Sequence, residues 1–286
     1  MKQFGKIFLM MAGLTALLVV LGGYVGGRGG ALLFFVMAAV MNFGMYWFSD
    51  RAVLKMYRAQ VVDAGQDPEL YAMVDRLRRR AGLPMPKLAI APAQQPNAFA
   101  TGRNPEHAVV CVTQGIRQAL SPRELEGVLA HELAHVKHRH MLVGTMAATM
   151  AGAVSLLATV ARWGAIFGGF GGRDNRNGFG LLIMSIVAPI AAMIIQFAVS
   201  RANEFQADRT GGELLGDPNA LADALEDLER TSQRVPMQVN PAAAQLAIVN
   251  PLTGDLGKGL MGLFRTHPPT EERVARLRAQ AAETHS

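Results

Sequence analysis

The stretch SPRELEGVLAHELAHVKHRH, residues 121–140, is predicted to form a helix on which both the fold and the chemistry of this chain depend. Its centre is the sequence His-Glu-Leu-Ala-His, which begins at His131 and ends at His135. Residues four apart lie on the same face of a helix, so both imidazole rings can bind one tetrahedral zinc ion. Glu132 lies beside them and can take a proton from a water molecule on the metal. The stretch therefore predicts a zinc site with a general base next to it.

The start of this helix and its apolar neighbours argue against a chance match to the HExxH pattern. Ser121 is the expected N-cap, Pro122 the first helical residue, and Glu124 the partner of Ser121 in a capping box. The apolar neighbours of the motif are Leu125, Val128, Leu129, Leu133 and Val136. A charged surface turn does not need this setting, whereas two histidines and a glutamate on a half-buried helix need a function there.

Half of the 286 residues are hydrophobic and only 17% are charged, which is less charge than a soluble domain usually carries. Four windows contain no charged residue, and they are 7–27, 29–49, 141–161 and 177–200. A helix of about 20 residues crosses the ~30 Å hydrocarbon core of a bilayer. We therefore expect four transmembrane helices, of which the first two form an uncleaved hairpin with a glycine-rich turn at 26–30.

The basic residues next to these windows predict the orientation of the chain. If the N-terminus is cytoplasmic, the basic residues inside are Lys2, Lys6, Arg51, Lys55, Arg58, Lys137, Arg139, Arg201 and Arg209. Those outside are Arg28, Arg162, Arg173 and Arg176. The excess inside favours this orientation. Two windows precede the HExxH motif and two follow it, so both polar parts of the chain are expected on the cytoplasmic side.

The lipid bilayer is thus an expected partner, and nucleic acid is not. The net charge of +6 is spread along the chain, and no basic tract is interleaved with aromatic residues. The single cysteine, Cys111, excludes an intramolecular disulfide and is expected to pack as a small apolar side chain.

The polar parts of the chain are expected to be mainly helical. Residues 68–81 have the pattern of an amphipathic helix. Its buried face is expected to carry Leu70, Met73, Val74 and Leu77. Further helices are expected at 201–231 and 271–279, and the HExxH helix is expected to run directly into the third apolar window at Met141.

Two strands are expected ahead of the HExxH helix, at 87–91 and 107–112, with the segment 96–102 between them. Strands in this position can form a small sheet beside the metal. An exposed edge of that sheet can pair with an extended peptide.

A catalytic zinc ion commonly takes three protein ligands, so the HExxH motif needs a third. The downstream candidate is Glu204, and Asp208 one helical turn later can accept a hydrogen bond from a ligand histidine. The alternative is that both carboxylates face solvent and pair with Arg201 or Arg209. The spacing alone favours neither interpretation.

The other nearby histidines are not expected to bind the same metal. His138 lies about 10 Å from His131 along a straight helix, and no glycine follows to bend the chain. We expect His138 and His140 to be polar residues at the membrane interface.

Taken together, these features resemble the membrane-bound zinc metalloproteases of the HtpX type, which are relatives of the CAAX prenyl proteases. Besides the N-terminal hydrophobic hairpin, the matching segments are PNAFATGRNPEHAVVCVTQG at 96–115, SPRELEGVLAHELAHVKHRH at 121–140, SRANEFQAD at 200–208, NPL at 250–252 and THPP at 266–269. They cover most of the chain in the right order. One departure is His140, where members of the family often carry an acidic residue.

The resemblance implies that Glu204 joins His131 and His135 as the third ligand of one zinc ion per chain. It also implies that the segment Asn97-Ala98-Phe99 lies along the substrate. A further implication is that His267 and Arg273 bind the substrate or stabilise the tetrahedral intermediate.

The predicted fold is an α+β integral membrane protein, with four transmembrane helices plus a mainly helical, zincin-like catalytic domain that contains a small β-sheet. Residues 1–50 are expected to form the N-terminal transmembrane hairpin, and residues 51–140 the first part of the catalytic domain, with the HExxH helix. Residues 141–200 are expected to form the second transmembrane hairpin, and residues 201–286 the second part of the catalytic domain, with the third zinc ligand.

The resemblance implies a zinc endopeptidase of the bacterial inner membrane, with its site facing the cytoplasm, that cleaves misfolded or membrane proteins in quality control. One alternative is a non-catalytic membrane adaptor that keeps zinc, against which the intact Glu132 argues. The other is a protease for prenylated C-termini, whose fold has more membrane spans than the four expected here.

Overall fold

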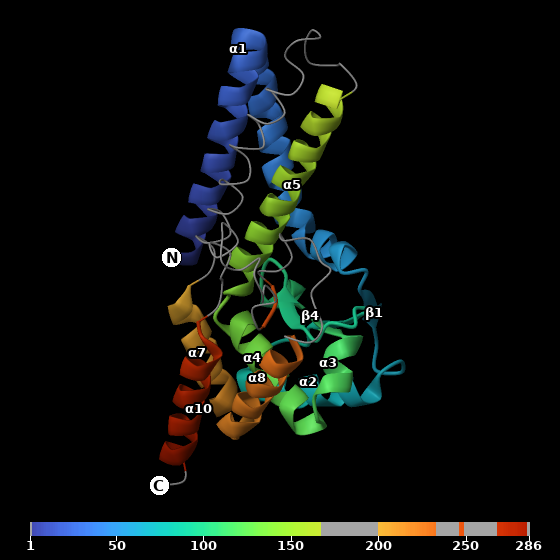
Figure 1. Cartoon of the computed structure of the whole chain (residues 1–286), viewed down its shortest axis with the longest axis vertical. Helices are drawn as coiled ribbons and strands as arrows, with labels where there is room; N and C mark the ends of the chain where they lie inside the picture. Colours follow the sequence, from blue (N-terminus) through green and yellow to red (C-terminus); the bar gives the residue numbers. More distant parts are fainter. Residues whose placement is uncertain (1, 167–199, 233–245, 249–267, 285–286) are drawn as a thin grey trace.

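The computed structural model describes residues 2–166, 200–232, 246–248 and 268–284 (Figure 1). Within these residues, a helical hairpin and one further helix extend side by side from one end of the molecule. A small sheet and a group of shorter helices form the other end. The prediction of a mainly helical chain with a small sheet is confirmed.

The long helix α1 (Lys2–Met56) is a hairpin of two arms joined at a kink. Gly26 and Gly27 have non-helical backbone angles, and the φ of Gly27 is 57°, a conformation that glycine adopts without steric cost. The arms approach closely where Gly22 faces Gly30, because a Cβ on Gly30 would lie 2.1 Å from the carbonyl oxygen of Gly22. The predicted glycine-rich turn is therefore present.

Two segments of α1, Phe4–Tyr24 and Gly26–Met56, are long and apolar enough to cross a membrane. Only 22% and 17% of their most apolar windows are buried, so most of their side chains face outward. The helix α5 (Met141–Ile166) packs against α1 through its apolar stretch Met141–Val154. Two of the four predicted spans are thus found in the described part of the chain, and the window at 177–200 lies almost wholly outside it.

The sheet has four strands in the spatial order β1-β2-β4-β3. They are β1 (Gln60–Val62), β2 (Lys87–Ala91), β3 (Ala98–Thr101) and β4 (Val109–Thr113). β1 is antiparallel to β2, β2 is parallel to β4, and β3 is antiparallel to β4. The segment predicted to lie between two strands therefore contains a strand of its own, and that strand forms one edge of the sheet.

The start of β4 corrects the prediction of a strand from His107. Residues Pro105–His107 form a 3-10 turn, η1, and the side chain of Asn104 accepts a hydrogen bond from the backbone N–H of His107. Because an asparagine cap and a proline favour a turn at this point, the strand begins only at Val109.

The helix α2 (Pro68–Ala81) has the predicted bounds. Asp67 accepts a hydrogen bond from the N–H of Leu70 at its start, and Gly82 ends it in the left-handed conformation. Its buried residues include the predicted Leu70, Met73, Val74 and Leu77. A short helix, α3 (Gln114–Ala119), follows β4 and leads to the HExxH helix.

The HExxH helix, α4 (Pro122–Lys137), lies at the centre of this end of the molecule, against α2, α7 (Arg201–Leu215) and α8 (Pro218–Ser232). The predicted capping box is present. The N–H of Glu124 donates to the hydroxyl of Ser121, and the N–H of Ser121 donates to the carboxylate of Glu124 at 2.7 Å.

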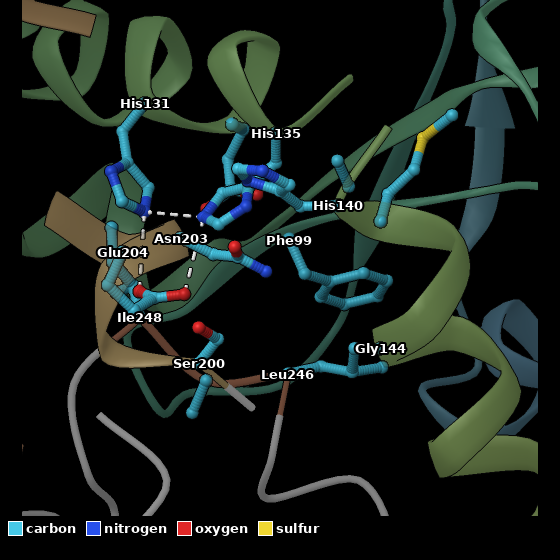
Figure 2. A pocket seen from close by; sticks show the side chains of 14 residues that line it. Phe99, His131, His135, His140, Gly144, Ser200, Asn203, Glu204, Leu246 and Ile248 are labelled. Atoms are coloured by element: carbon cyan, nitrogen blue, oxygen red, sulfur yellow. Dashed lines mark hydrogen bonds and ion pairs between the residues drawn. The ribbon is translucent and has the colours of Figure 1, made fainter. Parts of the chain in front are cut away.

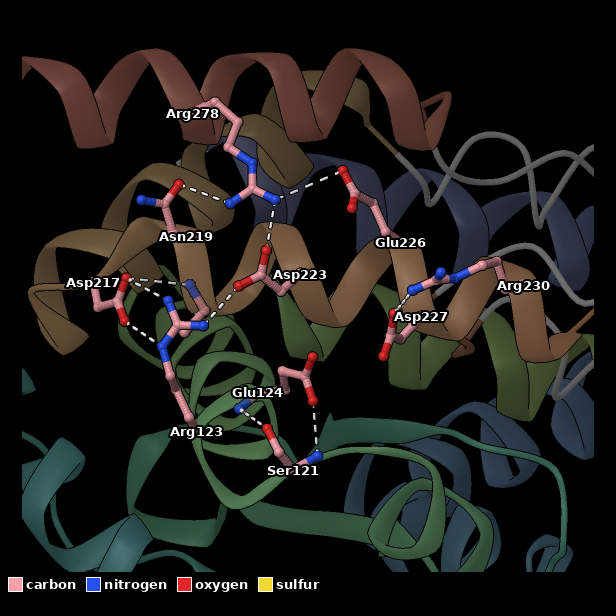
Figure 3. Close-up of polar contacts among 11 residues, drawn as sticks. Ser121, Arg123, Glu124, Asp217, Asn219, Asp223, Glu226, Asp227, Arg230 and Arg278 are labelled. Atoms are coloured by element: carbon pink, nitrogen blue, oxygen red, sulfur yellow. Dashed lines mark hydrogen bonds and ion pairs between the residues drawn. The ribbon is translucent and has the colours of Figure 1, made fainter.

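Arginine side chains connect these helices with α10 (Thr270–Thr284) (Figure 3). Arg123 on α4 donates to Asp217 and Asp223 at 2.6–3.0 Å. Arg278 on α10 donates to the same Asp223 at 2.5 Å. One carboxylate on α8 therefore holds guanidinium groups from two other helices.

The junction between α4 and α5 corrects the prediction of one continuous helix. α4 ends at Lys137, and Arg139 has a φ of 57°, a left-handed conformation that a right-handed helix does not contain. The N–H of His140 donates to the carbonyl oxygen of His135 and closes the turn. The chain thus changes direction between the two helices without a glycine.

Two glycines let α4 lie against the backbone of its neighbours. A Cβ on Gly127 would lie 2.8 Å from the backbone nitrogen of Leu221 in α8. A Cβ on Gly211 in α7 would lie 3.0 Å from the Cα and the backbone nitrogen of His131. Backbone atoms cannot swing aside as a flexible side chain does. The distance between α4 and α7 at His131 therefore depends on the missing side chain at Gly211.

We predict that Gly211→Ala pushes α7 away from α4 and destabilises the protein by about 1–3 kcal/mol, the usual cost of overpacking. The thermal unfolding midpoint in detergent measures this loss. Gly152→Ala is the matched control, because its Cβ would meet nothing closer than the side chain of Met56 at 4.0 Å. An unchanged midpoint for Gly211→Ala would contradict the close contact described here.

Candidate metal centre

The helices α4 and α7 bring the side chains of His131, His135 and Glu204 around one point (Figure 2). The Nε2 atoms of the two histidines are 3.1 Å apart. The carboxylate oxygens of Glu204 lie 3.9 Å from Nε2 of His131 and 3.6 Å from Nε2 of His135. Among the residues that the structure describes, this is the one group of three side chains arranged to hold a metal ion.

The arrangement fits a tetrahedral zinc ion. Zinc binds imidazole and carboxylate at ~2.0–2.2 Å, which places its ligand atoms about 3.4 Å from one another. The three distances lie on either side of this value. Two imidazoles and one carboxylate are also a donor set that leaves a fourth position open for chemistry.

The spacing in the sequence did not decide whether Glu204 and Asp208 face solvent, and the structure does. Glu204 is 6% exposed and faces the histidines, and Asp208 is 2% exposed. Both side chains are therefore buried, and the alternative in which they face solvent is wrong. A buried carboxylate needs a cation or hydrogen-bond donors around it.

Glu132 is also buried, with 5% of its surface exposed, and it lines the same cavity as the three side chains. Burial raises the pKa of its carboxyl group to about 7, and the charge of Glu204 also raises it. His131 and a hydrogen bond from the backbone of Ala100 act in the opposite direction. A cation between the three neighbouring side chains would further favour the ionised form, which is the form that can accept a proton.

Asp208 lies behind His131. Its Oδ1 is 2.9 Å from Nδ1 of the ring. Arg273 from α10 donates to both oxygens of Asp208 at 2.7 and 2.8 Å. Burial by itself would raise the pKa of Asp208, but Arg273 and His131 lower it well below its usual range. Asp208 is therefore a fixed negative charge against the far side of the imidazole.

The same Arg273 holds one wall of the cavity. Its Nη1 donates to the carbonyl oxygen of Ile248 at 2.9 Å. From the other side, the N–H of Ile248 donates to Oδ1 of Asn97 at 3.0 Å, and Nδ2 of Asn97 donates to the carbonyl oxygen of Leu246 at 3.4 Å. Residues 246–248, which line the cavity, are thus held by two side chains that were predicted to contact substrate.

The cavity has a volume of about 80 Å³ and is bounded by α4, α7, the start of α5, residues 246–248 and β3. Phe99 and Ala100 of β3 are among its lining residues, and the ring of Phe99 packs on Tyr57 with centroids 4.5 Å apart. Ala98 is fully buried in the core beneath the sheet. Of the predicted substrate segment, only Phe99 therefore lies at the cavity.

The remaining histidines are placed by the turn after α4. His140 lines the cavity, with its ring centroid 5.4 Å from that of His135. Nε2 of His138 lies 2.9 Å from the hydroxyl of Thr210 on α7. His267 is outside the described residues.

Sequence reasoning missed residues 246–248 as part of the site. The signal was the apolar run Leu246-Ala247-Ile248-Val249, within a segment that is otherwise rich in proline and asparagine. An apolar run in a polar connection indicates a place where the connection packs against the core.

Known peptidases are similar to this chain over most of its length. Residues 64–281 match the model of peptidase family M48. A protease HtpX homolog from Gemmatimonas aurantiaca is 58% identical over 97% of this chain and 99% of its own length. Others from Desulfatibacillum aliphaticivorans and Ralstonia pickettii are 56% and 52% identical, over 95% and 98% of this chain and 88% and 96% of their own lengths.

Among solved structures, the chain is similar to the crystal structure of S. mikatae Ste24p, with 17% identity and a TM-score of 0.48. The alignment covers 97% of this chain and 66% of that one. This likeness is too slight to carry an argument. The extensive identity to the HtpX homologs and the family match agree with the paired histidines and glutamates of α4 and α7, and the chain therefore belongs to peptidase family M48, among its HtpX-type metalloproteases.

Proposed function

We propose that this chain is a zinc endopeptidase of the bacterial inner membrane that cleaves misfolded or membrane proteins in quality control, with its site facing the cytoplasm. The observation that carries this proposal is the group of His131, His135 and Glu204 with Glu132 beside it, at a cavity next to an edge strand. A metalloprotease needs ligands for its metal, a base and a surface for the peptide backbone, and His131, His135 and Glu204, Glu132 and the edge strand are placed to supply them.

The roles of the side chains follow from their positions. His131, His135 and Glu204 would hold the metal. A zinc ion bound there would act as a Lewis acid and would lower the pKa of water toward ~7. Glu132 takes the proton of the attacking water and passes it to the leaving amine. Asp208 fixes the ring of His131, and Arg273 fixes Asp208, so we assign Arg273 a positioning role. His267 remains our proposed group for stabilising the oxyanion.

The edge strand β3 supplies a place for an extended substrate. The N–H of Thr113 donates to the carbonyl oxygen of Asn97, so antiparallel alternation turns the backbone groups of Ala98 and Ala100 away from β4. Ala98 is fully buried and Ala100 is 6% exposed, so a peptide would have to reach this edge from the cavity, where it would pass beside Glu132. Because backbone pairing does not depend on side chains, cleavage should be only loosely selective for sequence.

Two observations support a second membrane hairpin and a site at the membrane surface. Met141, where α5 begins, and Ser200, which directly precedes α7, both line the cavity. The two ends of the segment 141–200 therefore lie on the same side, and we infer two spans between them. The basic residues counted above favour the cytoplasm for that side.

The alternatives fit these observations less well. A non-catalytic adaptor that keeps zinc has no use for Glu132 as a base in the cavity. A protease for prenylated C-termini remains the nearer alternative, and peptides with and without a prenyl group distinguish it.

We predict that the purified protein in detergent cleaves an unfolded substrate such as casein, and that a chelator removes this activity and added zinc restores it. Zinc content per chain and the rate of cleavage are measured on the same samples. Cleavage that persists after complete removal of metal would contradict a metal-dependent mechanism.

We predict that Glu132→Gln lowers kcat by about 10²–10⁴ while zinc stays bound, because the amide cannot accept the proton. Glu126→Gln is the matched control, since Glu126 lies on the same helix and pairs with Arg76 away from the cavity. Full proteolysis by Glu132→Gln would rule out the proposed base.

We predict that Arg273→Met destabilises the protein by about 3–5 kcal/mol, because the charge of Asp208 is left buried and unpaired. Zinc affinity should fall about 10–100-fold, as expected when a partner of a ligand histidine is disturbed. Thermal unfolding and zinc titration measure the two effects. The double change Asp208→Asn with Arg273→Met should recover much of the stability but not the zinc affinity, and recovery of both would contradict the positioning role.

A further inference from the structure

The apolar surface of the second arm of α1 ends abruptly. Large exposed apolar side chains run from Leu32 to Phe48. One turn later Arg51 is exposed, and from there Val53 and Tyr57 are buried against the sheet. The edge of the surface suited to lipid chains therefore lies between Phe48 and Arg51.

The length of this arm agrees with that boundary. Arg28, in the turn of the hairpin, and Phe48 are separated by 48 − 28 = 20 residues, or ~30 Å of helix at 1.5 Å per residue. This equals the thickness of the hydrocarbon core. With Arg28 at one surface, Arg51 lies in the headgroup layer of the other.

Two arginines rest on aromatic rings at this depth. The Cζ atom of Arg51 is 5.6 Å from the ring centre of Phe48, and that of Arg103 is 4.6 Å from the ring centre of Trp47. Arg103 belongs to the loop after β3, so the half of the molecule that carries the cavity also reaches this layer. A guanidinium group held by an aromatic ring keeps N–H donors for a phosphate.

These two arginines differ from most others in their lack of an acidic partner. Arg123 on α4 forms a short ion pair with Asp217, and Arg278 on α10 forms one with Asp223. Within the described ranges, neither Arg51 nor Arg103 forms an ion pair with a carboxylate. Two positive charges on aromatic rings at headgroup depth are therefore left for anions from the membrane.

Further charges nearby keep this surface positive. The exposed side chains of Lys55 and Arg58 follow Arg51, and the acidic residues within five positions of these basic residues are Asp50, Asp63 and Glu106. Four basic groups against three acidic ones leave an excess of positive charge facing the headgroups.

Arg103 is connected to the cavity by a short path. The hydroxyl groups of Thr101, at the end of β3, and Thr145, in α5, are 3.0 Å apart, and the N–H of Gly102 donates to the same hydroxyl of Thr145 at 3.4 Å. Phe99 and Ala100 of that strand line the cavity. The end of β3 is thus held by α5 on one side and by Arg103 at the membrane surface.

We propose that Arg51 and Arg103 form a binding surface for the phosphate groups of anionic phospholipids, and that the lipid bound at Arg103 steadies β3 for substrate. The second part rests on the proposed function, because it concerns cleavage. The first part concerns lipid binding alone and can be decided without any proteolysis.

The lipid-binding part is tested by the fluorescence of Trp47. The chain has two tryptophans, so Trp163→Phe leaves Trp47 as the single reporter. Brominated phosphatidylglycerol is compared with brominated phosphatidylcholine as a quencher in vesicles. We expect about fivefold stronger binding of the anionic lipid for each arginine in contact, from about 1 kcal/mol per basic residue at the surface.

The controls separate a specific surface from general attraction. Arg103→Gln should lower the preference for the anionic lipid at Trp47 about fivefold, the double change Arg51→Gln with Arg103→Gln should bring it close to one, and Arg103→Lys should keep part of it. Arg230→Gln removes the same charge from the exposed pair with Asp227 on α8 and should change nothing. Equal quenching by both lipids in the parent protein, or an equal loss of preference in Arg230→Gln, would overturn the proposal.

The coupling part is tested by casein cleavage in nanodiscs of either lipid. We expect kcat/KM to be about fivefold higher with phosphatidylglycerol, and Arg103→Gln to abolish this difference without changing the rate in phosphatidylcholine. Equal rates in both lipids, with selective quenching intact, would refute the coupling and leave the lipid surface in place. Absence of cleavage in every lipid would count against the proposed function, while the fluorescence still decides the lipid surface.

Discussion

The contact between α4 and α7 buries ionisable side chains together, and the surrounding structure is arranged to balance their charges. His131, Glu132 and Glu204 are each at most 6% exposed, as is Asp208. A buried charge without a partner is costly, so the site needs Arg273 on one side and a metal cation on the other. The absence of a side chain at Gly211 is what lets the two helices approach closely enough for this arrangement.

The same charges connect parts of the chain that are distant in sequence. Arg273 from the last helix reaches both Asp208 and the carbonyl oxygen of Ile248, and Asn97 from the sheet reaches the N–H of the same Ile248. The wall of the cavity is therefore part of the same network as Asp208 and His131. A change in this wall should alter the environment of His131, because Ile248 and Asp208 share the guanidinium group of Arg273.

Much of the local structure could be predicted because its causes are local. The capping box of Ser121 and Glu124 and the apolar face of α2 each depend on residues within a few turns of one helix. The turn at Arg139 could not be predicted, because this left-handed residue is not a glycine and gives no signal in the sequence. The contacts of Asn97 and Arg273 could not be predicted either, since their partners lie at 246–248 and 208.

By itself, the sequence determined the helix that carries His131 and His135, the apolar hairpin at the N-terminus, and the family. The helix and the hairpin each follow from a pattern within one continuous segment, and the family follows from short motifs that occur in order along the chain. Only the tertiary structure decided that Glu204 faces the histidines and that Arg273 lies behind Asp208 instead of at the cavity. The physical reason is that helical spacing sets the direction of a side chain on its own helix, whereas the neighbour it meets depends on how closely two helices pack.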